Sequence, residues 1–185
     1  IKRSSALAWG LIQSDRSHLA LIQSVTIPGD IFSFLLGDTS PSIKDPEHIV
    51  ALNLMDGPSI VEGYAGVMNQ PVGCVNLVGG LTLNERTLFV SQLAICNGCS
   101  CYRFFTQSEE NVSVEKLLSE LRCLIIQHKD RSCYLYWPNL LDHCAKQPDV
   151  RQVIKLLSEQ NNVKLFFDDE DSQRFDVAEN SLALS

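Results

Sequence analysis

Three cysteines occur within six positions of the segment AICNGCSCYRFF, at Cys96, Cys99 and Cys101. Cys96 and Cys99 have the C-x2-C spacing at which a tight turn allows two thiolates to bind one tetrahedral zinc ion. A structural zinc site needs four ligands, and no second C-x2-C or H-x3-H pair occurs in the chain. The three cysteines are therefore the candidate ligands for half of a metal site. No cofactor is predicted for the chain, and zinc is the alternative that these residues leave open.

Two other pairs of residues offer the missing ligands. His128 with Cys133, or His143 with Cys144, would complete the zinc site if the fold brings one pair to the three cysteines. His143 and Cys144 also have the residue types of a general base and its nucleophile. Neighbours on a helix point about 100° apart, so this pair cannot form the hydrogen bond that such chemistry needs. No catalytic residue is predicted.

The favoured interpretation of the cysteine segment is structural rather than chemical. Cys96 is predicted to end a buried strand as a small hydrophobic residue, with Gly98 and Ser100 in the turn that follows. A redox function is disfavoured, because a redox-active C-x2-C pair opens a helix whose N-terminus lowers the thiol pKa. This interpretation leaves Cys99 and Cys101 unexplained.

The total of seven cysteines is odd, which favours free thiols over a disulfide framework. Free thiols are typical of a reducing compartment, and the protein is expected to be intracellular, in the nucleus or cytoplasm. The chain opens with Ile-Lys-Arg rather than Met, so it is predicted to be one domain, residues 1–185, of a longer protein.

The net charge of −7 disfavours nucleic acid as a partner, because no basic stripe is present to bind phosphates. The longest uncharged run, residues 63–84, is interrupted by Pro71 and several glycines, so no membrane span is predicted. Residues 168–185 form an acidic tail that is expected to be peripheral. Its acidic run, residues 168–171, is predicted to be solvated rather than to bind Mg²⁺ or Ca²⁺.

The first half of the chain is predicted to form antiparallel hairpins. Strands are expected at 6–12 and 18–27, then a short helix at 31–38 that Gly37 ends. A second hairpin is expected from two segments joined at Asn69-Gln70, and another strand follows. These three segments are SIVEGYAGVM, PVGCVNLVGG and RTLFVSQLAIC.

The second half is predicted to contain two βα crossover units. Apolar residues recur at helical spacing after Ser113 and again after Pro148, and the strands CYLYW and VKLFF follow those two helices. Alternation places Tyr134 and Tyr136 on one face of their strand and Trp137 on the other, with one face in the core and the other free for contacts. The fold class is therefore α+β with a mixed sheet.

From residue 60 onward the expected order of elements resembles that of the N-acetyltransferase family, with GVMNQPVGCVNL as its central hairpin. The resemblance implies an acetyl-coenzyme A loop between the long strand and the next helix. The segment CNGCSCYRFFTQSEENVS stands there without an R/Q-x-x-G-x-G/A motif, and Glu109 and Glu110 would repel phosphates. The resemblance thus implies a catalytically degenerate pseudoenzyme, and no cofactor-binding residue is assigned.

The expected function is a non-enzymatic protein-interaction or scaffolding domain of a larger intracellular protein. Its expected partners are other proteins, including other regions of the parent chain. This expectation follows from the incomplete catalytic sets and the apolar strand edges. The alternatives are a degenerate acetyltransferase-like fold and a zinc-stabilised structural domain.

Overall fold

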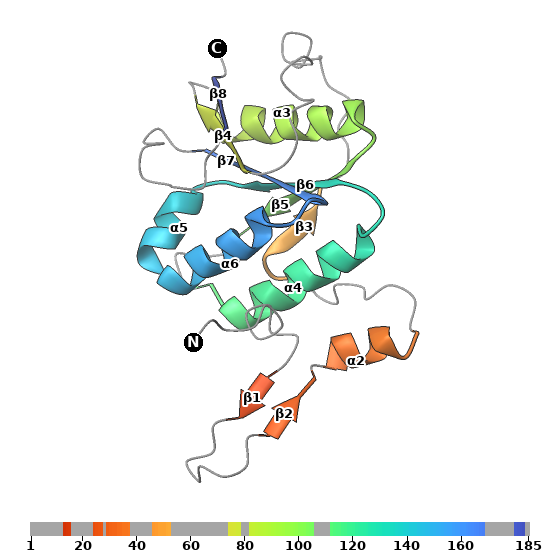
Figure 1. Cartoon of the computed structure of the whole chain (residues 1–185). Helices are drawn as coiled ribbons and strands as arrows, with labels where there is room; N and C mark the ends of the chain where they lie inside the picture. Colours follow the sequence, from red (N-terminus) through yellow and green to blue (C-terminus); the bar gives the residue numbers. More distant parts are fainter. Residues whose placement is uncertain are drawn as a thin grey trace.

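The computed structural model describes residues 13–15, 24–27, 29–37, 46–52, 74–78, 82–105, 112–168 and 180–183. It shows an α+β fold in which a mixed six-stranded sheet lies between two layers of helices (Figure 1). The sheet order is β3-β5-β6-β7-β4-β8, and a separate hairpin is formed by β1 and β2. The strands are β1 (Gln13–Asp15), β2 (Ser24–Thr26), β3 (Ile49–Ala51), β4 (Cys74–Val78), β5 (Ser100–Phe104), β6 (Cys133–Trp137), β7 (Val163–Phe167) and β8 (Asn180–Ala183).

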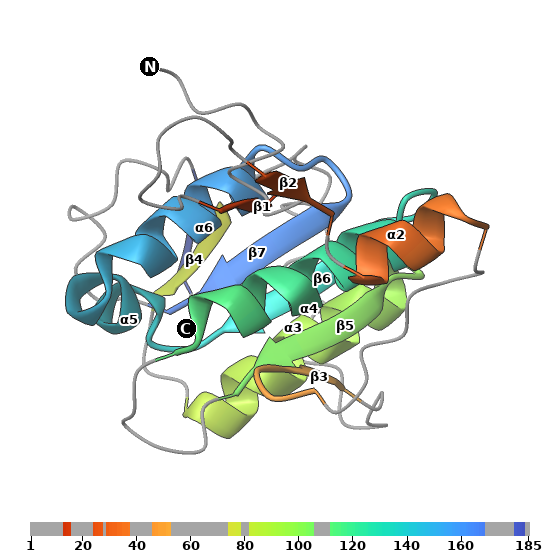
Figure 2. The ribbon, with the colours of Figure 1, turned by 90° about the horizontal axis from the view of Figure 1, so that it is seen from below.

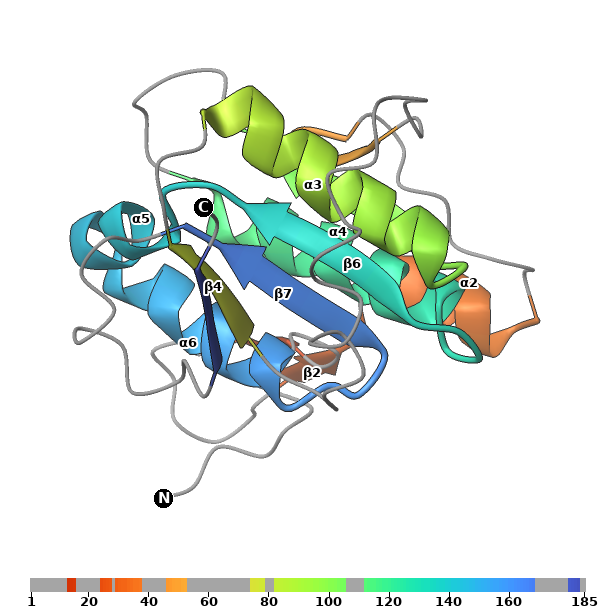
Figure 3. The same cartoon turned by 90° about the horizontal axis from the view of Figure 1, so that it is seen from above.

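Five strands of the sheet run parallel, and only the edge strand β3 is antiparallel to its neighbour β5. Helix α3 covers one face of the sheet, and α4, α5 and α6 cover the other (Figures 2 and 3). Each layer encloses its own apolar core. The helices are α2 (Gly29–Leu35), α3 (Leu83–Cys96), α4 (Val114–Gln127), α5 (Leu140–Lys146) and α6 (Pro148–Ser158).

The direction of the chain across the sheet reverses after β4. From β4 the chain passes through α3 to β5, which lies three positions away in the sheet, and then returns through β6 to β7, next to β4. Right-handed crossovers in opposite directions put their helices on opposite faces of a sheet. This rule explains why α3 lies alone on its face. The chain changes direction across the sheet at the carboxyl end of β4, which lies beside that of β7.

The prediction of a strand at residues 86–96 is wrong, because this segment belongs to α3. Thr82 and Glu85 form a capping box at the start of the helix, with the Thr82 side chain bonded to the Glu85 backbone and the Glu85 carboxylate to the Thr82 backbone. The buried apolar residues then follow one helical stripe. An apolar run of this length fits a buried strand or a buried helix equally well by composition. The buried apolar residues are Phe89, Val90, Leu93 and Ala94.

The prediction of a second antiparallel hairpin is also wrong. Strand β4 pairs with β7 on one side and β8 on the other, and both pairings are parallel. The other predicted strand of that hairpin, residues 59–68, lies outside the described residues. The resemblance to N-acetyltransferases depended on this hairpin and on the long strand at 86–96, so the element order that carried it is incorrect.

The structure places a central strand, β5, where the sequence predicted a turn and polar loop. Gly98 follows α3 with a φ of 62°, a left-handed conformation that glycine adopts without strain and that ends a helix. The predicted turn at Gly98 is therefore confirmed. Strand β5 begins two residues later and pairs with β3 and β6.

The predicted crossover units are confirmed as α4, β6, α6 and β7. Ser113 caps α4 by accepting a hydrogen bond from the Lys116 backbone N–H. The predicted helix before Gly37 is α2. An antiparallel pair is present in this region, but its first strand, β1, occupies Gln13–Asp15, which were expected in the turn. The strand predicted at 6–12 and residues 18–23 of the second predicted strand lie outside the described residues.

The aromatic strand β6 is buried along its whole length, so the expected contact face is wrong. Tyr134 and Tyr136 pack in the core beneath α3, whereas Trp137 packs in the core beneath α4 and α6. The predicted alternation is therefore right. Both faces are nevertheless covered, because β6 lies in the middle of the sheet between two layers of helices.

The edge strand β3 is held to α4 by a buried carboxylate. Glu120 is only 2% exposed and accepts hydrogen bonds from three successive backbone N–H groups. The donors are Glu47 at 2.9 Å, His48 at 3.1 Å and Ile49 at 2.7 Å. Glu120 therefore compensates backbone groups that a three-residue edge strand leaves without sheet partners.

Candidate functional site

The carboxyl ends of β4 and β7 meet at the point where the chain reverses direction. In open α/β sheets, ligands bind in the crevice outside the carboxyl ends of the strands at such a point. Three features of this protein lie at or beside it. They are the buried carboxylate that follows β7, the first turns of α3, and a pocket between α3 and β5.

The carboxylate of Asp168 receives three hydrogen bonds from three different elements. Its Oδ2 accepts from Arg86 Nη1 of α3 at 2.9 Å and from Tyr136 Oη of β6 at 2.9 Å. Its Oδ1 accepts from the backbone N–H of Asn139, before α5, at 2.8 Å. The side chains of Arg86 and Asp168 are 15% and 7% exposed. Asp168 therefore ties α3, β6 and the start of α5 to the end of β7.

The prediction that the acidic run is solvated is therefore wrong for Asp168, whose side chain is buried and paired. The other acidic residues of the run, 169–171, lie outside the described residues. Burial raises the pKa of Tyr136, and the neighbouring Asp168 carboxylate raises it further. Tyr136 therefore stays protonated and donates its hydrogen bond at every pH at which the protein would work.

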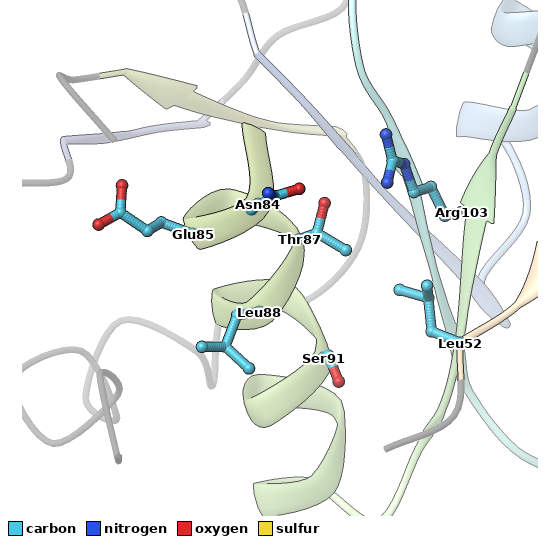
Figure 4. Close-up of a pocket in the computed structure, with 7 residues that line it drawn as sticks. All are labelled: Leu52, Asn84, Glu85, Thr87, Leu88, Ser91 and Arg103. Atoms are coloured by element: carbon cyan, nitrogen blue, oxygen red, sulfur yellow. The ribbon is translucent and has the colours of Figure 1, made fainter. Parts of the chain in front are cut away.

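A pocket of about 510 Å³ lies beside this cluster, between α3 and the strands β3 and β5. The side chains of Thr87 and Ser91 project from α3 toward the strand side, where Leu52 and Arg103 lie (Figure 4). Glu85 extends to the other side of the helix (Figure 4). The volume falls in the range of pockets that hold small organic molecules. The described residues that line it are Leu52, Asn84, Glu85, Thr87, Leu88, Ser91 and Arg103.

Two polar atoms of the pocket wall have no hydrogen-bond partner among the described residues. Ser91 is 3% exposed, and its Oγ is buried and unpartnered. The Nε of Arg103 is also buried and unpartnered. By contrast, Thr87 Oγ1 donates to the Leu83 carbonyl at 2.7 Å. Sequence reasoning missed Arg103 because the strand that carries it, β5, was not predicted.

The structure places the three cysteines of the predicted metal half-site in three different environments, exposed, half-buried and buried. Cys96 is exposed at the end of α3, so the expectation that it is a core residue at a strand end is wrong. Cys99 is half-buried, and its thiol lies 3.4 Å from the Asn97 carbonyl. Cys101 is buried in the core beneath α3. The C-x2-C pair therefore follows a helix rather than opening one, where the partial negative charge of the helix C-terminus disfavours thiolates.

Of the residues that were expected to complete the zinc site, Cys133 has a pKa that burial raises, and it lies close enough to Cys99 and Cys101 for their charges to raise this pKa further, whereas His128 and His143 have other partners. Cys133 lies at the start of β6, beside Ser100 of β5, and the Tyr102 hydroxyl lies 2.8 Å from His128 Nε2. His143 Nδ1 accepts a hydrogen bond from Trp137 Nε1 at 2.9 Å. Within the described part of the chain, no group of three or more His, Cys, Asp or Glu side chains is placed to hold a metal ion. Zinc binding by Cys96, Cys99 and Cys101 stays a prediction.

The buried thiols are held in their protonated form. Burial raises the pKa of Cys101 and of Cys133 from 9.0 to about 12. Burial also raises the pKa of Cys144, to about 11, and that of Cys99. A thiol is nucleophilic only as its thiolate, so the raised pKa values disfavour these four groups as nucleophiles at neutral pH.

We expect the free energy of unfolding to fall as the pH rises from 9 to 12 in the presence of a reductant. The unfolded chain loses its thiol protons near pH 9, whereas folded Cys101 and Cys133 keep theirs up to about pH 12. The folded state therefore binds more protons in this interval, and stability decreases with pH. Urea unfolding at intervals between pH 8 and pH 11 measures the slope.

The double variant Cys101→Ala/Cys133→Ala should show a shallower slope than the wild type. Other groups whose pKa values burial raises, among them Cys144 to about 11 and Tyr134 to about 12, contribute to the slope that remains. Cys96→Ala, at an exposed position, is the matched control and should leave the slope unchanged. An identical slope in the double variant and the wild type would contradict the assignment.

The largest exposed apolar side chains of the described residues gather on and beside α2. Phe32, Leu35 and Leu36 are 53%, 65% and 72% exposed, and Ile27 just before the helix is 47% exposed. Ile31 is buried, so the helix has one anchored side and one apolar side that faces out. We call Ile27, Phe32, Leu35 and Leu36 the α2 surface. Large exposed apolar patches mark interaction sites.

None of the helices in the described ranges is long and apolar enough to cross a membrane. Comparison with known proteins assigns no relatives: no protein-family model matches the chain, and no curated protein sequence is similar to it. The function must therefore be inferred from the site geometry and the surface of this chain.

Proposed function

We propose that this chain is a non-enzymatic protein-interaction and scaffolding domain that binds its partner through the α2 surface. The observation that carries the proposal is the spacing of the exposed apolar side chains on α2. Phe32 and Leu35 stand at positions i and i+3 of α2, and Leu36 follows the last helical residue at i+4, with its backbone N–H donating to the Phe32 carbonyl at 3.0 Å, so the three share one face. A helix that presents such a face to solvent has the pattern by which amphipathic helices enter an apolar groove of another protein.

The charge of the sequence segment that contains α2 indicates what kind of groove would accept it. Residues 29–47 contain four acidic residues and one basic residue. Like charges that meet across an interface disfavour binding, whereas complementary charges steer association. The proposed partner is therefore a protein with an apolar groove rimmed by basic side chains. The acidic residues are Asp30, Asp38, Asp45 and Glu47, and the basic residue is Lys44.

The titratable groups of the described residues support a binding function over a catalytic one. The raised pKa values of Cys99, Cys101, Cys133 and Cys144 keep these thiols protonated and disfavour a cysteine nucleophile. Asp168, at the place where ligands of α/β sheets bind, is already engaged by three donors. It acts in this arrangement as a structural link between elements.

The compartment proposed for this domain is the nucleus or the cytoplasm. All seven cysteines are free thiols in the structure, four of them strand or helix residues deep in the two cores. Free thiols persist in reducing compartments, whereas secreted domains pair them. This supports an intracellular location.

The α2 surface is tested by affinity capture followed by direct binding. The purified 185-residue chain, immobilised, is exposed to cell extract, and the captured proteins are quantified by mass spectrometry for the wild type and for Phe32→Asp/Leu35→Asp. We expect a captured protein whose amount falls at least about tenfold with the double variant, since central apolar anchors contribute most of the binding energy. That protein, once purified, should bind the chain directly with the same dependence.

Ile95→Asp is the matched control, because Ile95 is a 42% exposed apolar residue on α3. This variant should capture the same protein in the same amount as the wild type. Circular dichroism spectra of both variants should match that of the wild type, which checks that the variants are folded. Capture that is insensitive to Phe32 and Leu35, or turnover of an acyl or phosphoryl substrate by the chain, would overturn the proposal.

A further inference from the structure

The pocket between α3 and β5 contains polar groups that the described part of the chain leaves without partners. Ser91 is only 3% exposed, and its hydroxyl has no hydrogen-bond partner among the described residues. Buried polar groups are almost always paired, because an unpaired one costs free energy in the folded state. Ser91 lines an open pocket and faces the strand side, so a bound molecule can supply the missing partner (Figure 4).

Arg103 stands on the opposite wall of the same pocket. Among the described residues it forms no ion pair, and its Nε is buried without a hydrogen-bond partner. Its guanidinium points toward the first turns of α3 (Figure 4). The carboxylates of Asp168 and Glu85 are engaged elsewhere, since Asp168 is bonded to Arg86 and Glu85 accepts from Thr82. Arg103 is therefore a cation that forms no ion pair with a described carboxylate and that can accept an anionic ligand.

We infer that this pocket binds a small organic carboxylate. The carboxylate of the ligand pairs with Arg103, and either this carboxylate or another acceptor of the ligand accepts a hydrogen bond from Ser91. The apolar body of the ligand lies against Leu52 and Leu88. The planar guanidinium matches a carboxylate in geometry and forms charge-assisted hydrogen bonds with it. The two leucines supply apolar wall, as expected for a pocket that takes an organic body. This inference goes beyond the proposed function, because it concerns a different surface.

The charge of the pocket selects a monoanion over a dianion. Among the described lining residues, Arg103 is the one cationic side chain, and Glu85 adds a negative charge at the edge of the pocket. A phosphate monoester would bring a second negative charge that no described lining residue compensates, and burying an unpaired charge is costly. A monocarboxylate therefore fits better than a phosphate on an equal apolar body.

The test compares three probes that share an eight-carbon chain and differ in the head group: octanoate, octanamide and octyl phosphate. Binding to the 185-residue chain is measured by NMR titration, with calorimetry where affinity allows. We expect octanoate to bind at least about tenfold more tightly than octanamide, which lacks the charge, and more tightly than octyl phosphate.

Three variants assign the binding to this pocket. Arg103→Gln should weaken octanoate binding at least about tenfold and leave octanamide binding unchanged. Asn84→Glu, at an exposed position in the first turn of α3, should weaken octanoate binding severalfold by repulsion while keeping the helix intact. The matched control is Arg131→Gln, an exposed arginine in the turn before β6, which should bind octanoate as the wild type does.

Several results would overturn the inference. These are no octanoate binding up to about 10 mM, equal affinities for octanoate and octanamide, tighter binding of octyl phosphate, or wild-type octanoate affinity in the Arg103 variant. If Arg103→Gln does not fold, the Asn84→Glu variant decides in the same way. Phe32→Asp/Leu35→Asp should bind octanoate normally, so failure of this inference and failure of the proposed partner surface are distinguishable.

Discussion

Replacement of Asp168 by asparagine is expected to lower the free energy of unfolding by about 3 kcal/mol, because it breaks a buried ion pair by removing one partner. Arg86 and Asp168 are 15% and 7% exposed, so little water reaches the pair to screen it or to solvate the arginine that is left. The magnitude is checked by urea unfolding at neutral pH.

The geometry explains why asparagine does not substitute for aspartate here. Oδ2 of Asp168 accepts from both Arg86 Nη1 and Tyr136 Oη, each at 2.9 Å, while Oδ1 accepts from the Asn139 backbone. An asparagine has one oxygen and one NH₂ group, so at least one donor of the protein would face another donor. The loss therefore includes an unpaired buried charge as well as a lost hydrogen bond.

Two controls separate the charge from the hydrogen bonds. Tyr136→Phe removes a single donor and leaves the ion pair, and should cost only about 1 kcal/mol. Asp130→Asn changes the same functional group at an exposed position after α4 and should stay within about 0.5 kcal/mol of the wild type. If Asp168→Asn is no more destabilising than Asp130→Asn, the proposed link between α3, β6 and β7 is wrong.

Replacement of Glu120 by glutamine is expected to destabilise the protein by about 2 to 3 kcal/mol. The Glu120 carboxylate is 2% exposed and lies within 2.7–3.1 Å of three successive backbone nitrogens at the start of β3. Glutamine keeps the shape of the side chain but replaces one acceptor oxygen with a donor. At least one of the backbone N–H groups would then be buried without an acceptor.

The loss of stability in Glu120→Gln should be concentrated at the edge of the sheet, in β3. Hydrogen exchange of the backbone amides of Glu47, His48 and Ile49 should accelerate strongly in Glu120→Gln, because these groups lose their acceptor. Glu115→Gln is the matched control: it lies on the same helix, is exposed, and should cost no more than the loss of a favourable charge in the first turn, about 0.3 to 1 kcal/mol. Equal stability and equal exchange in the two variants would contradict the role of Glu120.

Elements with strong local signals could be predicted from the sequence. The cap at Ser113 and the apolar spacing that follows it predicted α4, and Pro148 predicted the start of α6. Gly37 and Gly98 predicted the ends of a helix and a turn, and both adopt positive φ angles. These features depend on a few neighbouring residues, so the sequence pattern contains them.

The strand prediction at 86–96 failed because burial on one stripe of a helix and burial on both faces of a strand draw on the same apolar residues. The capping box of Thr82 and Glu85 was the local signal that distinguishes the two. Because a strand was predicted at 86–96, the residues that follow were predicted as a loop, and β5 was not predicted. Arg103 and the pocket that it lines were lost with β5.

The candidate site depended on residues that are far apart in the sequence. Arg86 and Asp168 are separated by 82 positions, and Glu120 is 73 positions from Glu47. The sequence pattern places Asp168 directly after a strand but does not predict its burial, because no residue near it in the chain is its partner. The order of the strands brings the partners together.

The sequence by itself determined the class of fold and the helices and strands whose signals are local. Its odd number of cysteines also favoured free thiols, and the structure contains seven of them. Only the tertiary structure decided that Cys96 is exposed while Cys101 is buried, that Asp168 is paired, and that Ser91 and Arg103 face one pocket. The physical reason is that caps and periodicity act over a few residues, whereas burial and pairing follow from the order in which strands assemble.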